Sequence, residues 1–504
     1  MSTAPAIRAW SRHVPLYARI AVRLGKSNIP FYLFFAACLL LSIFVLVDYP
    51  GRWYVYLLFS IVLNALLFLG MRKDSLFFDL FIGGLFWLGY WLKFSIRMAF
   101  LDGNFVGKLG YFDYSGDDFD HALIVVSCGV SGLLLARVLR ARYWFSYPGT
   151  GAEIGLSGLC AFYERHRLSI WIAFLVLVVA ISASNAFLGI YQRGLAPRIN
   201  LPYKLGGVFT WILLFGAAML SALMLNFELK LHRAIPLALV LIVLFETFAS
   251  NVSMLSRGMI LNASVLIMGT YVVVRRERIG LAPRLVGTTL TALVCLFLIS
   301  LLIVNYLRLD EYYESYLSRA HEETASVPSA EKLAPYTSIL LLDRWVGIEG
   351  AMAVSSYPNL EWDLLHDAWT ERFSHYGTSM YDIEIAKGVT KQDQAFMKEH
   401  GQHFISMPGI LSFFYYPASH VFLFAAMFLA GAFAAGIEVA TFKLAGYNLI
   451  LCSLVAFTVA YRYAHFGYAP SRSYLLFGAI AASIALIYLA DRLATRWTGS
   501  SRRT

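Results

Sequence analysis

The sequence predicts an all-α polytopic membrane protein. Of its 504 residues, 59% are hydrophobic and only 14% are charged, whereas a soluble domain carries about 25% charged residues. The apolar residues gather in long runs, and a bilayer core needs about 20 of them per helix. We predict twelve transmembrane helices: Pro30–Val47, Trp53–Gly70, Leu76–Phe100, His121–Ala136, Leu168–Phe187, Gly206–Phe227, Ala234–Leu255, Gly258–Val274, Leu285–Tyr306, Ser412–Ile437, Gly446–Tyr461 and Ser473–Ala490.

Basic residues mark one side of the predicted membrane domain. Residues 1–29 carry five basic side chains and no acid, and the C-terminal tail, residues 491–504, adds four arginines. The positive-inside rule predicts that both termini are cytoplasmic, which an even number of spans also requires. The net charge of +10 therefore belongs to topology, and we expect no nucleic-acid partner.

The spans divide the chain unevenly. Nine of them fall in residues 30–306 and three in residues 412–490, with about a hundred mostly polar residues, 307–411, between the two groups. Loops this long are usually functional. We interpret this one as a small, mainly helical extracytoplasmic subdomain, because Ser338–Leu342 and Trp345–Val354 have the apolar periodicity of a helix.

The cysteine pattern argues against a disulfide framework or a zinc site. The five cysteines have no metal-ligand spacing, and the large loop contains none of them. We also find no nucleotide-binding glycine motif and no metal-binding helix motif. We therefore expect neither a metal nor another cofactor.

A polar stripe runs along one predicted span. Glu246, Ser250, Ser253 and Arg257 are separated by four, three and four residues, so they share one face of a helix. Such a stripe must face protein or trapped water rather than lipid. Two interpretations follow, namely a functional cavity and a helix contact joined by polar side chains.

Basic residues are also found on the predicted outer face, where the positive-inside rule disfavours them. Several cations at one membrane surface suit an anion. Arginine's planar fork matches phosphate best, and tyrosine and phenylalanine between the basic residues suit sugar rings. Each group also has an ordinary interpretation, either a snorkelling side chain or an interfacial aromatic belt. The five groups are Arg257, Lys93 with Arg97, Arg193 with Arg198 and Lys204, Arg344, and Arg462 and Arg472 around Tyr461–Tyr468, which includes His465.

Three motifs in order give a family resemblance. Ser256-Arg257-Gly258 opens a span, Arg344 precedes a helix rich in Gly and Glu, and Met407–Tyr416 places Pro-Gly and aromatic residues ahead of another span. This order resembles the bacterial oligosaccharide repeat-unit polymerases, the Wzy-type O-antigen polymerases, over roughly residues 230–440. The family often has a glycine where this chain has Pro417–His420, which leaves His420 as a functional change or as drift.

The resemblance implies a GT-C-like, metal-independent glycosyltransferase of the bacterial inner membrane. Its donor and acceptor would be undecaprenyl-pyrophosphate-linked oligosaccharides, joined at the periplasmic face during O-antigen or related polysaccharide biosynthesis. Its other expected partners are membrane lipids and a chain-length-regulating co-polymerase.

We assign candidate roles on this basis. Arg257 and Arg344 would bind the donor pyrophosphate and stabilise its developing charge. Glu349 or His403 would deprotonate the acceptor hydroxyl, with Asp343, His375 and His420 as weaker candidates. Glu349 could instead be the ion-pair partner of Arg344. The predicted substrate-binding residues are Lys93, Arg97, Arg193, Arg198, Glu246, Tyr416, His420, Arg462, His465 and Arg472.

Two other functions fit the same features. An O-antigen ligase, or another polyprenyl-dependent GT-C transferase, would share the architecture and the basic outer face. A flippase or other transporter of lipid-linked oligosaccharides would place charge near the membrane midplane, where Glu246 is the deepest candidate.

Overall fold

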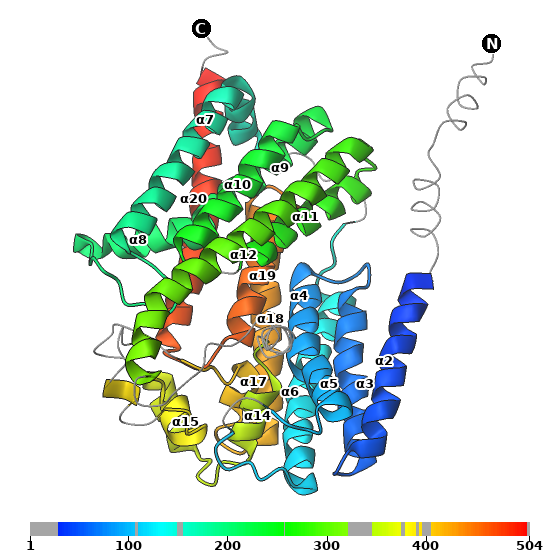
Figure 1. Ribbon diagram of the computed structural model, residues 1–504. Helices are drawn as coiled ribbons and strands as arrows, with labels where there is room; N and C mark the ends of the chain where they lie inside the picture. Colours follow the sequence, from blue (N-terminus) through cyan, green and yellow to red (C-terminus); the bar gives the residue numbers. More distant parts are fainter. Residues whose placement is uncertain are drawn as a thin grey trace, which may run out of the picture.

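Helices make up the whole described architecture. The computed structural model describes residues 29–105, 109–148, 155–256, 258–320, 345–373, 378–389, 393–395 and 405–500, and no strand occurs among them (Figure 1). The elements are α2 (Ile29–Asp48), α3 (Trp53–Gly70), α4 (Phe77–Phe86), η2 (Trp87–Leu92), α5 (Lys93–Phe100), α6 (Gly116–Tyr143), α7 (Ser157–Leu188), η3 (Pro202–Lys204), α8 (Leu205–Trp211), η4 (Ile212–Gly216), α9 (Ala217–His232), α10 (Leu237–Ser253), α11 (Met259–Arg276), α12 (Pro283–Ala320), α14 (Ile348–Ser355), α15 (Trp362–Thr370), η5 (Tyr381–Ile385), α17 (Ile410–Phe414), α18 (His420–Leu444), α19 (Leu449–Ala464) and α20 (Ser471–Ser500).

The helices have the length and composition of a multi-pass membrane protein. Within the described ranges, eight helices are long and apolar enough to cross a membrane. Three shorter apolar helices lie at Tyr32–Asp48, Leu237–Ser253 and Leu449–Ala464. The all-α polytopic class is therefore confirmed. Every one of the twelve predicted ranges overlaps a helix, α11 included, while the number of twelve spans stays a prediction.

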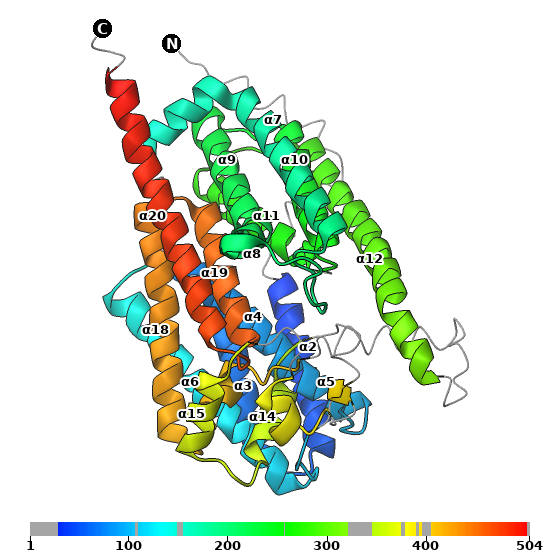
Figure 2. The same ribbon diagram turned by 90° about the vertical axis from the view of Figure 1, so that its left-hand side faces the viewer.

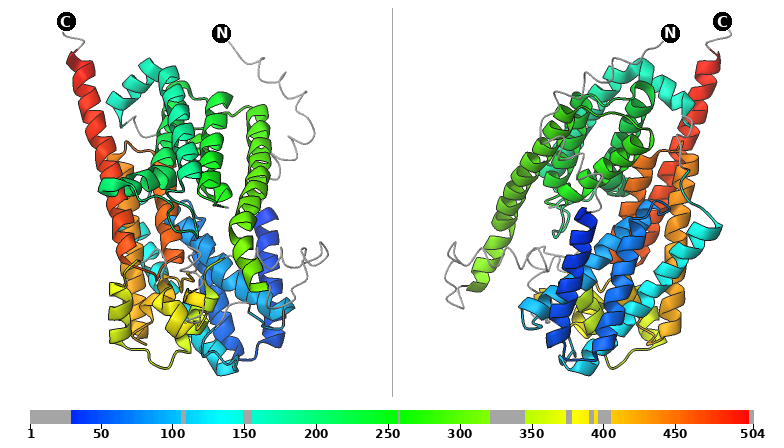
Figure 3. Two further views of the ribbon diagram at one scale, coloured as in Figure 1. Left: turned by 60° about the vertical axis from the view of Figure 1, so that its left-hand side comes forward. Right: turned by 90° about the vertical axis from the view of Figure 1, so that its right-hand side faces the viewer.

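Two groups of helices pack around a shared centre. In the first group, α18 lies along α6, and α3 packs against both α4 and α6. In the second, α10 packs against α7 and α12. Helix α19 joins the groups, because it packs against α4 on one side and α11 and α9 on the other (Figure 2). Helix α12 runs obliquely across the molecule in Figure 1, and in the right-hand view of Figure 3 it lies tilted along one side.

The helices α14, α15 and α17 gather at one end of the bundle, which we call the distal end (Figure 1). Helices α6, α18 and α20 begin there, and α5 and α19 end there. The distal end therefore collects the ends of many elements, and the loop residues 405–409, 415–419 and 465–470 lie between them.

The tenth predicted span, Ser412–Ile437, is wrong at its start. Helix α17 ends at Phe414, and α18 begins only at His420. Pro417 has no backbone N–H to continue a helix, and Ala418 adopts a positive φ of 56°. The Ser419 side chain then caps α18 by accepting a hydrogen bond of 3.2 Å from the Phe422 N–H.

The large loop also begins and folds differently from the prediction. Helix α12 continues to Ala320, past the predicted end of its span at Tyr306. The helix predicted at Trp345–Val354 begins later, as α14 at Ile348. The predicted helix Ser338–Leu342 lies outside the described residues. Apolar periodicity located α14 but not its first residue. Gly347, directly before that residue, packs against the backbone of Gly89.

Glycines bring three backbones of the distal end into direct contact. A Cβ atom on Gly347 would lie 2.3 Å from the Gly89 carbonyl oxygen, and one on Gly350 would lie 2.1 Å from that of Pro408. Gly467, at φ +125°, packs against the Pro408 ring. The Gly409 N–H donates a 3.0 Å hydrogen bond to the carbonyl of Phe466, beside Gly467. The Pro408-Gly409 segment is therefore held between α14 and the loop that joins α19 to α20. We call these contacts of Gly350, Gly409 and Gly467 the glycine clamp.

We predict that Gly350→Ala destabilises the distal end by about 1–3 kcal/mol, as over-packing usually does. The added methyl group would meet the Pro408 carbonyl, a backbone atom that cannot turn aside. Thermal unfolding in detergent measures the effect. Gly84→Ala is the matched control, because a Cβ at Gly84 would meet nothing within 4 Å. Equal melting temperatures for the two variants would contradict the clamp.

Candidate functional site

A buried ion pair joins the membrane domain to the distal helices. Lys93 Nζ lies 2.5 Å from Glu349 Oε1, and the two side chains are only 3% and 17% exposed. The same ammonium donates a 3.1 Å hydrogen bond to the carbonyl of Trp345. Lys93 begins α5 directly after the π-helix η2, a local widening that is frequent at functional sites. The pair therefore fixes the start of α14 against α5.

This geometry bears on the sequence interpretations of Glu349, Lys93 and Arg97. Glu349 pairs with Lys93, which the sequence analysis did not foresee. Arg97 is buried as well, and its guanidinium donates a 2.6 Å hydrogen bond to the Asn104 carbonyl. Snorkelling is therefore wrong for both Lys93 and Arg97, because each lies inside the protein. Both residues lie on α5, four positions apart, so they share one face of that helix.

Arg193 belongs to an aromatic cluster at the end of α19. Its guanidinium donates hydrogen bonds to the hydroxyl oxygens of Tyr191 and Tyr461. Tyr461 also stacks on His465, with ring centroids 4.0 Å apart and an angle of 22° between the planes. The Arg193 N–H donates a 3.0 Å hydrogen bond to the Met254 carbonyl, so the loop after α7 is tied to the end of α10.

Two further arginines continue this cluster. Arg462 donates a 2.7 Å hydrogen bond to Ser473 Oγ and lies over the Phe466 ring at 5.6 Å. Arg472 stands 3.9 Å from the centroid of the Phe373 ring. The guanidinium groups of Arg462 and Arg472 are close enough to repel one another. The structure thus brings together four predicted residues, which with Tyr461 we call the arginine–aromatic cluster: Arg193, Arg462, His465 and Arg472.

Three other predicted residues lie apart from that cluster. Arg198 is exposed, and its aliphatic part packs on Gly189. Tyr416 is fully buried in the core, and its hydroxyl makes no hydrogen bond to the described part of the chain. The His420 ring lies 6.3 Å from that of His121, whose Nε2 is 2.8 Å from the Tyr415 hydroxyl.

The polar stripe of α10 is present and buried. Glu246 accepts hydrogen bonds of 3.3 Å from Thr247 and from Ser250, both on its own helix. Ser253 is buried in turn, and its backbone carbonyl accepts a 2.9 Å hydrogen bond from the Asn185 side chain on α7. At Ser253 the stripe therefore takes part in a helix–helix contact, as the second interpretation of its sequence proposed.

The remaining predicted residues lie outside the described residues: Arg257, Asp343, Arg344, His375 and His403. Described neighbours of two of them make contacts already given. Trp345 follows Arg344 and binds Lys93 through its carbonyl. Met254, three residues before Arg257, binds the Arg193 backbone.

Two acids of the distal end were missed by sequence reasoning, namely the half-buried Glu371 and the buried Asp382. Burial raises the pKa of Glu371, which accepts a 2.6 Å hydrogen bond from the Met380 N–H. Burial likewise raises the pKa of Asp382, which accepts bonds from the Ser379 hydroxyl at 2.5 Å and the Ser406 N–H. Acidic residues in a polar loop look solvent-exposed, so their burial had no sequence signal.

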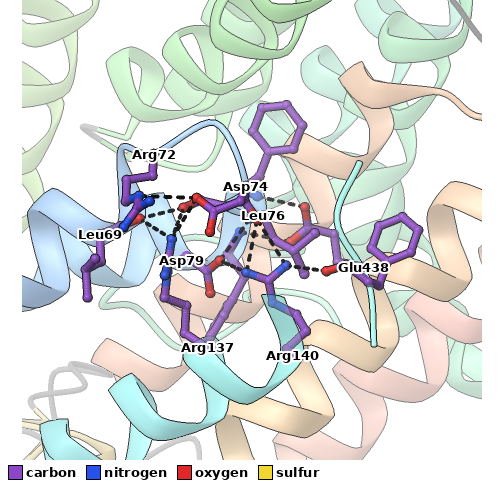
Figure 4. A network of polar contacts seen from close by, with 12 residues as sticks. Leu69, Arg72, Asp74, Leu76, Asp79, Arg137, Arg140 and Glu438 are labelled. Carbon is purple, nitrogen blue, oxygen red and sulfur yellow. Dashed lines mark hydrogen bonds and ion pairs between the residues drawn. The ribbon is translucent and has the colours of Figure 1, made fainter. Parts of the chain in front are cut away.

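A second polar centre lies where α4 begins and α6 ends, away from the distal end (Figure 4). Arg140 Nη2 contacts Asp79 Oδ2 at 2.5 Å, and Arg137 Nη2 contacts Asp74 Oδ1 at 3.1 Å. Glu438 of α18 accepts hydrogen bonds from three donors, which are the N–H groups of Phe77 (2.8 Å) and Phe78 (2.9 Å) and the Tyr147 hydroxyl (2.5 Å).

This second centre is a structural tie. A carboxylate at the first turn of α4 satisfies helix N–H groups that have no partner within the helix. The structure buries both Arg137 and Arg140. Their spacing of three residues at the end of an apolar helix, close in sequence to no acid, gave no sign of the distant partners.

The fold and these sites define an all-helical, multi-pass membrane protein with a cation-rich and aromatic centre at its distal end. Among the described residues, no group of three or more His, Cys, Asp or Glu side chains could hold a metal ion. No protein-family model, curated protein or solved structure matches this chain.

We predict that Lys93→Met lowers the stability by about 3–5 kcal/mol, because it removes a buried cation that pairs with the Glu349 carboxylate. Adding Glu349→Gln should recover most of this loss. The two single variants and the double variant form a cycle that is measured by thermal unfolding in detergent. Simple additivity of the two effects would show that the pair contributes no coupling.

We also predict that Glu438→Gln destabilises the protein by about 1.5–3 kcal/mol, the range for hydrogen bonds to a charged group. The amide keeps one accepting oxygen for three donors. Glu361→Gln on the exposed surface is the control and should leave the melting temperature nearly unchanged. A similar small shift in both variants would exclude a role for Glu438 in holding α4.

Proposed function

We propose that this chain polymerises oligosaccharide repeat units linked to undecaprenyl pyrophosphate, transferring the growing glycan to the terminal sugar of a second lipid-linked unit. In this proposal the fold is GT-C-like with twelve spans, and the distal end faces the periplasm. The product would be O-antigen or a related surface polysaccharide.

The arginine–aromatic cluster is the observation that carries this proposal. Its arginines come from three separate segments, namely the loop after α7, the end of α19 and the start of α20. Placing like charges together costs energy unless an anion or a carboxylate offsets the repulsion. A bound diphosphate would offset it, and arginine's fork suits that group.

The motifs behind the family resemblance support the same site. The Pro-Gly segment, the start of α14 and the loop from His465 to Pro470 are in direct contact through the glycine clamp. Sequence order alone placed two of these segments, the Pro-Gly segment and the helix α14, in one family pattern. Their contact in space supports the view that they act together.

The rings around the cluster suit the sugar part of the substrate. Arg472 stands 3.9 Å from the centroid of the Phe373 ring, and Tyr461 stacks on His465 with ring centroids 4.0 Å apart. Aromatic faces of this kind offer large contact area at little entropic cost. The diphosphate would then lie by the arginines and the sugars along the rings.

The catalytic base in this proposal is Glu349 or His403. The ammonium of Lys93 stabilises the charged carboxylate of Glu349, which is the form that a general base requires. Arg257 and Arg344 keep the role that the resemblance implies, binding the leaving pyrophosphate together with the arginine–aromatic cluster.

We predict that Arg462→Ala and Arg472→Ala each lower polymer formation on the order of 100-fold, as loss of one charge-stabilising donor does. The variants are expressed in a strain lacking the gene, and the glycolipid ladder is resolved on a gel. We expect core bearing a single repeat unit, without longer bands. Arg257→Ala should give the same result.

Arg275→Ala is the matched control, because Arg275 is an exposed arginine in the last turn of α11. It should leave the ladder unchanged. A normal ladder in the Arg462 and Arg472 variants would remove the cluster from the reaction. If the deletion strain instead accumulates long polymer on undecaprenyl pyrophosphate, the protein is a ligase.

A further inference from the structure

The short helix α15 has two sharply different faces. Asp363, His366, Asp367 and Thr370 are all exposed and lie on one side. Leu364 and Ala368 are buried against the protein on the other side. A period of 3.6 residues accounts for this division.

Two tryptophans lie along one edge of α15, between these faces. Trp362 and Trp369 are seven residues apart, so they share a helix face. Trp362 is 58% exposed and Trp369 is 37% exposed. Exposed tryptophans are costly in water, whereas the membrane–water interface accommodates their apolar ring and polar N–H together.

Each tryptophan contacts the first turn of a long apolar helix. The ring centroid of Trp362 is 4.9 Å from that of Phe422 on α18, and that of Trp369 is 6.3 Å from Tyr474 on α20. Both α18 and α20 are among the helices long and apolar enough to cross a membrane. Figure 2 shows α15 beside the N-terminal end of α18.

The exposed apolar surface continues from α15 onto these two helices. Val421 and Leu429 on α18 are 81% and 64% exposed, and Tyr474 and Leu475 on α20 are 56% and 65% exposed. In a bilayer such faces contact lipid. The tryptophan edge of α15 therefore lies where that lipid-facing surface reaches its distal limit.

From this continuity we infer that α15 is an interfacial helix that binds the lipid bilayer through Trp362 and Trp369. Its occupant is lipid, at the level of the headgroups and the first part of the acyl chains. The polar face is acidic, since Asp363 and Asp367 lie on it, so binding comes from apolar and aromatic contact rather than attraction to anionic lipids. Helix α15 thereby anchors the distal end to the membrane surface. This inference is independent of the proposed enzymatic activity.

Tryptophan quenching in vesicles tests the inference. The full chain is reconstituted into phosphatidylcholine vesicles that contain lipid brominated either near the headgroup or near the end of the acyl chain. Fluorescence of Trp362→Phe and Trp369→Phe is subtracted from that of the unaltered protein, which isolates each ring among the eleven tryptophans. Trp362→Tyr and Trp369→Tyr serve as second variants if the Phe variants fold poorly.

We expect most of each difference signal to be lost with lipid brominated near the headgroup, and less with the deeper label. Aqueous iodide should quench it weakly, and adding anionic lipid should change neither result. Trp91→Phe is the control, because Trp91 is fully buried and its signal should resist both quenchers. Quenching by iodide but not by brominated lipid would place α15 in water. Quenching by neither would mean that protein covers it. Either result overturns the inference.

Discussion

Direct backbone contact at the Pro408–Gly409 segment is the constraint on which the distal end depends. Gly350 and Gly467 let α14 and the loop after α19 approach Pro408 from two sides, at distances that no side chain would permit. The Gly409 N–H is satisfied there by the carbonyl of Phe466. Because segments far apart in sequence meet through main-chain atoms, their relative position has little freedom. The neighbouring ion pair of Lys93 and Glu349 and the arginine–aromatic cluster take their geometry from this contact.

Polar ties have a similar task at both ends of the bundle. Between helices in lipid, burial of apolar surface gives little driving force, so packing and hydrogen bonds decide which helices associate. At one end Lys93 and Glu349 join α5 to α14. At the other, Glu438 joins α18 to the first turn of α4. Each tie uses a charged side chain that would be costly to bury alone, so pairing the wrong helices would leave that charge without a partner.

Local patterns predicted the helices well, and long-range partners poorly. Runs of apolar residues located each predicted span on a helix, because membrane helices satisfy their own backbone groups. The same logic failed at Ser412, where Pro417 divides the segment and periodicity across the break still looked helical. The basic residues at 193, 462 and 472 were singled out because topology disfavours them, and three of the segments concerned do meet. Nothing local could show that Lys93 would meet Glu349, since 256 positions separate them; such a pairing is a property of the fold.

The corner between α17 and α18 has a consequence of its own. Ala418 holds a left-handed backbone conformation, which costs an ordinary L-residue about 1–2 kcal/mol and glycine almost nothing. The chain accepts this penalty at the position where α18 is directed into the bundle. An alanine there restricts the unfolded chain more than glycine would, so part of the penalty returns as a smaller entropy loss on folding. The Cβ atom of Ala418 therefore has two opposing effects at this corner. It strains the folded backbone, and it lowers the conformational entropy of the unfolded chain.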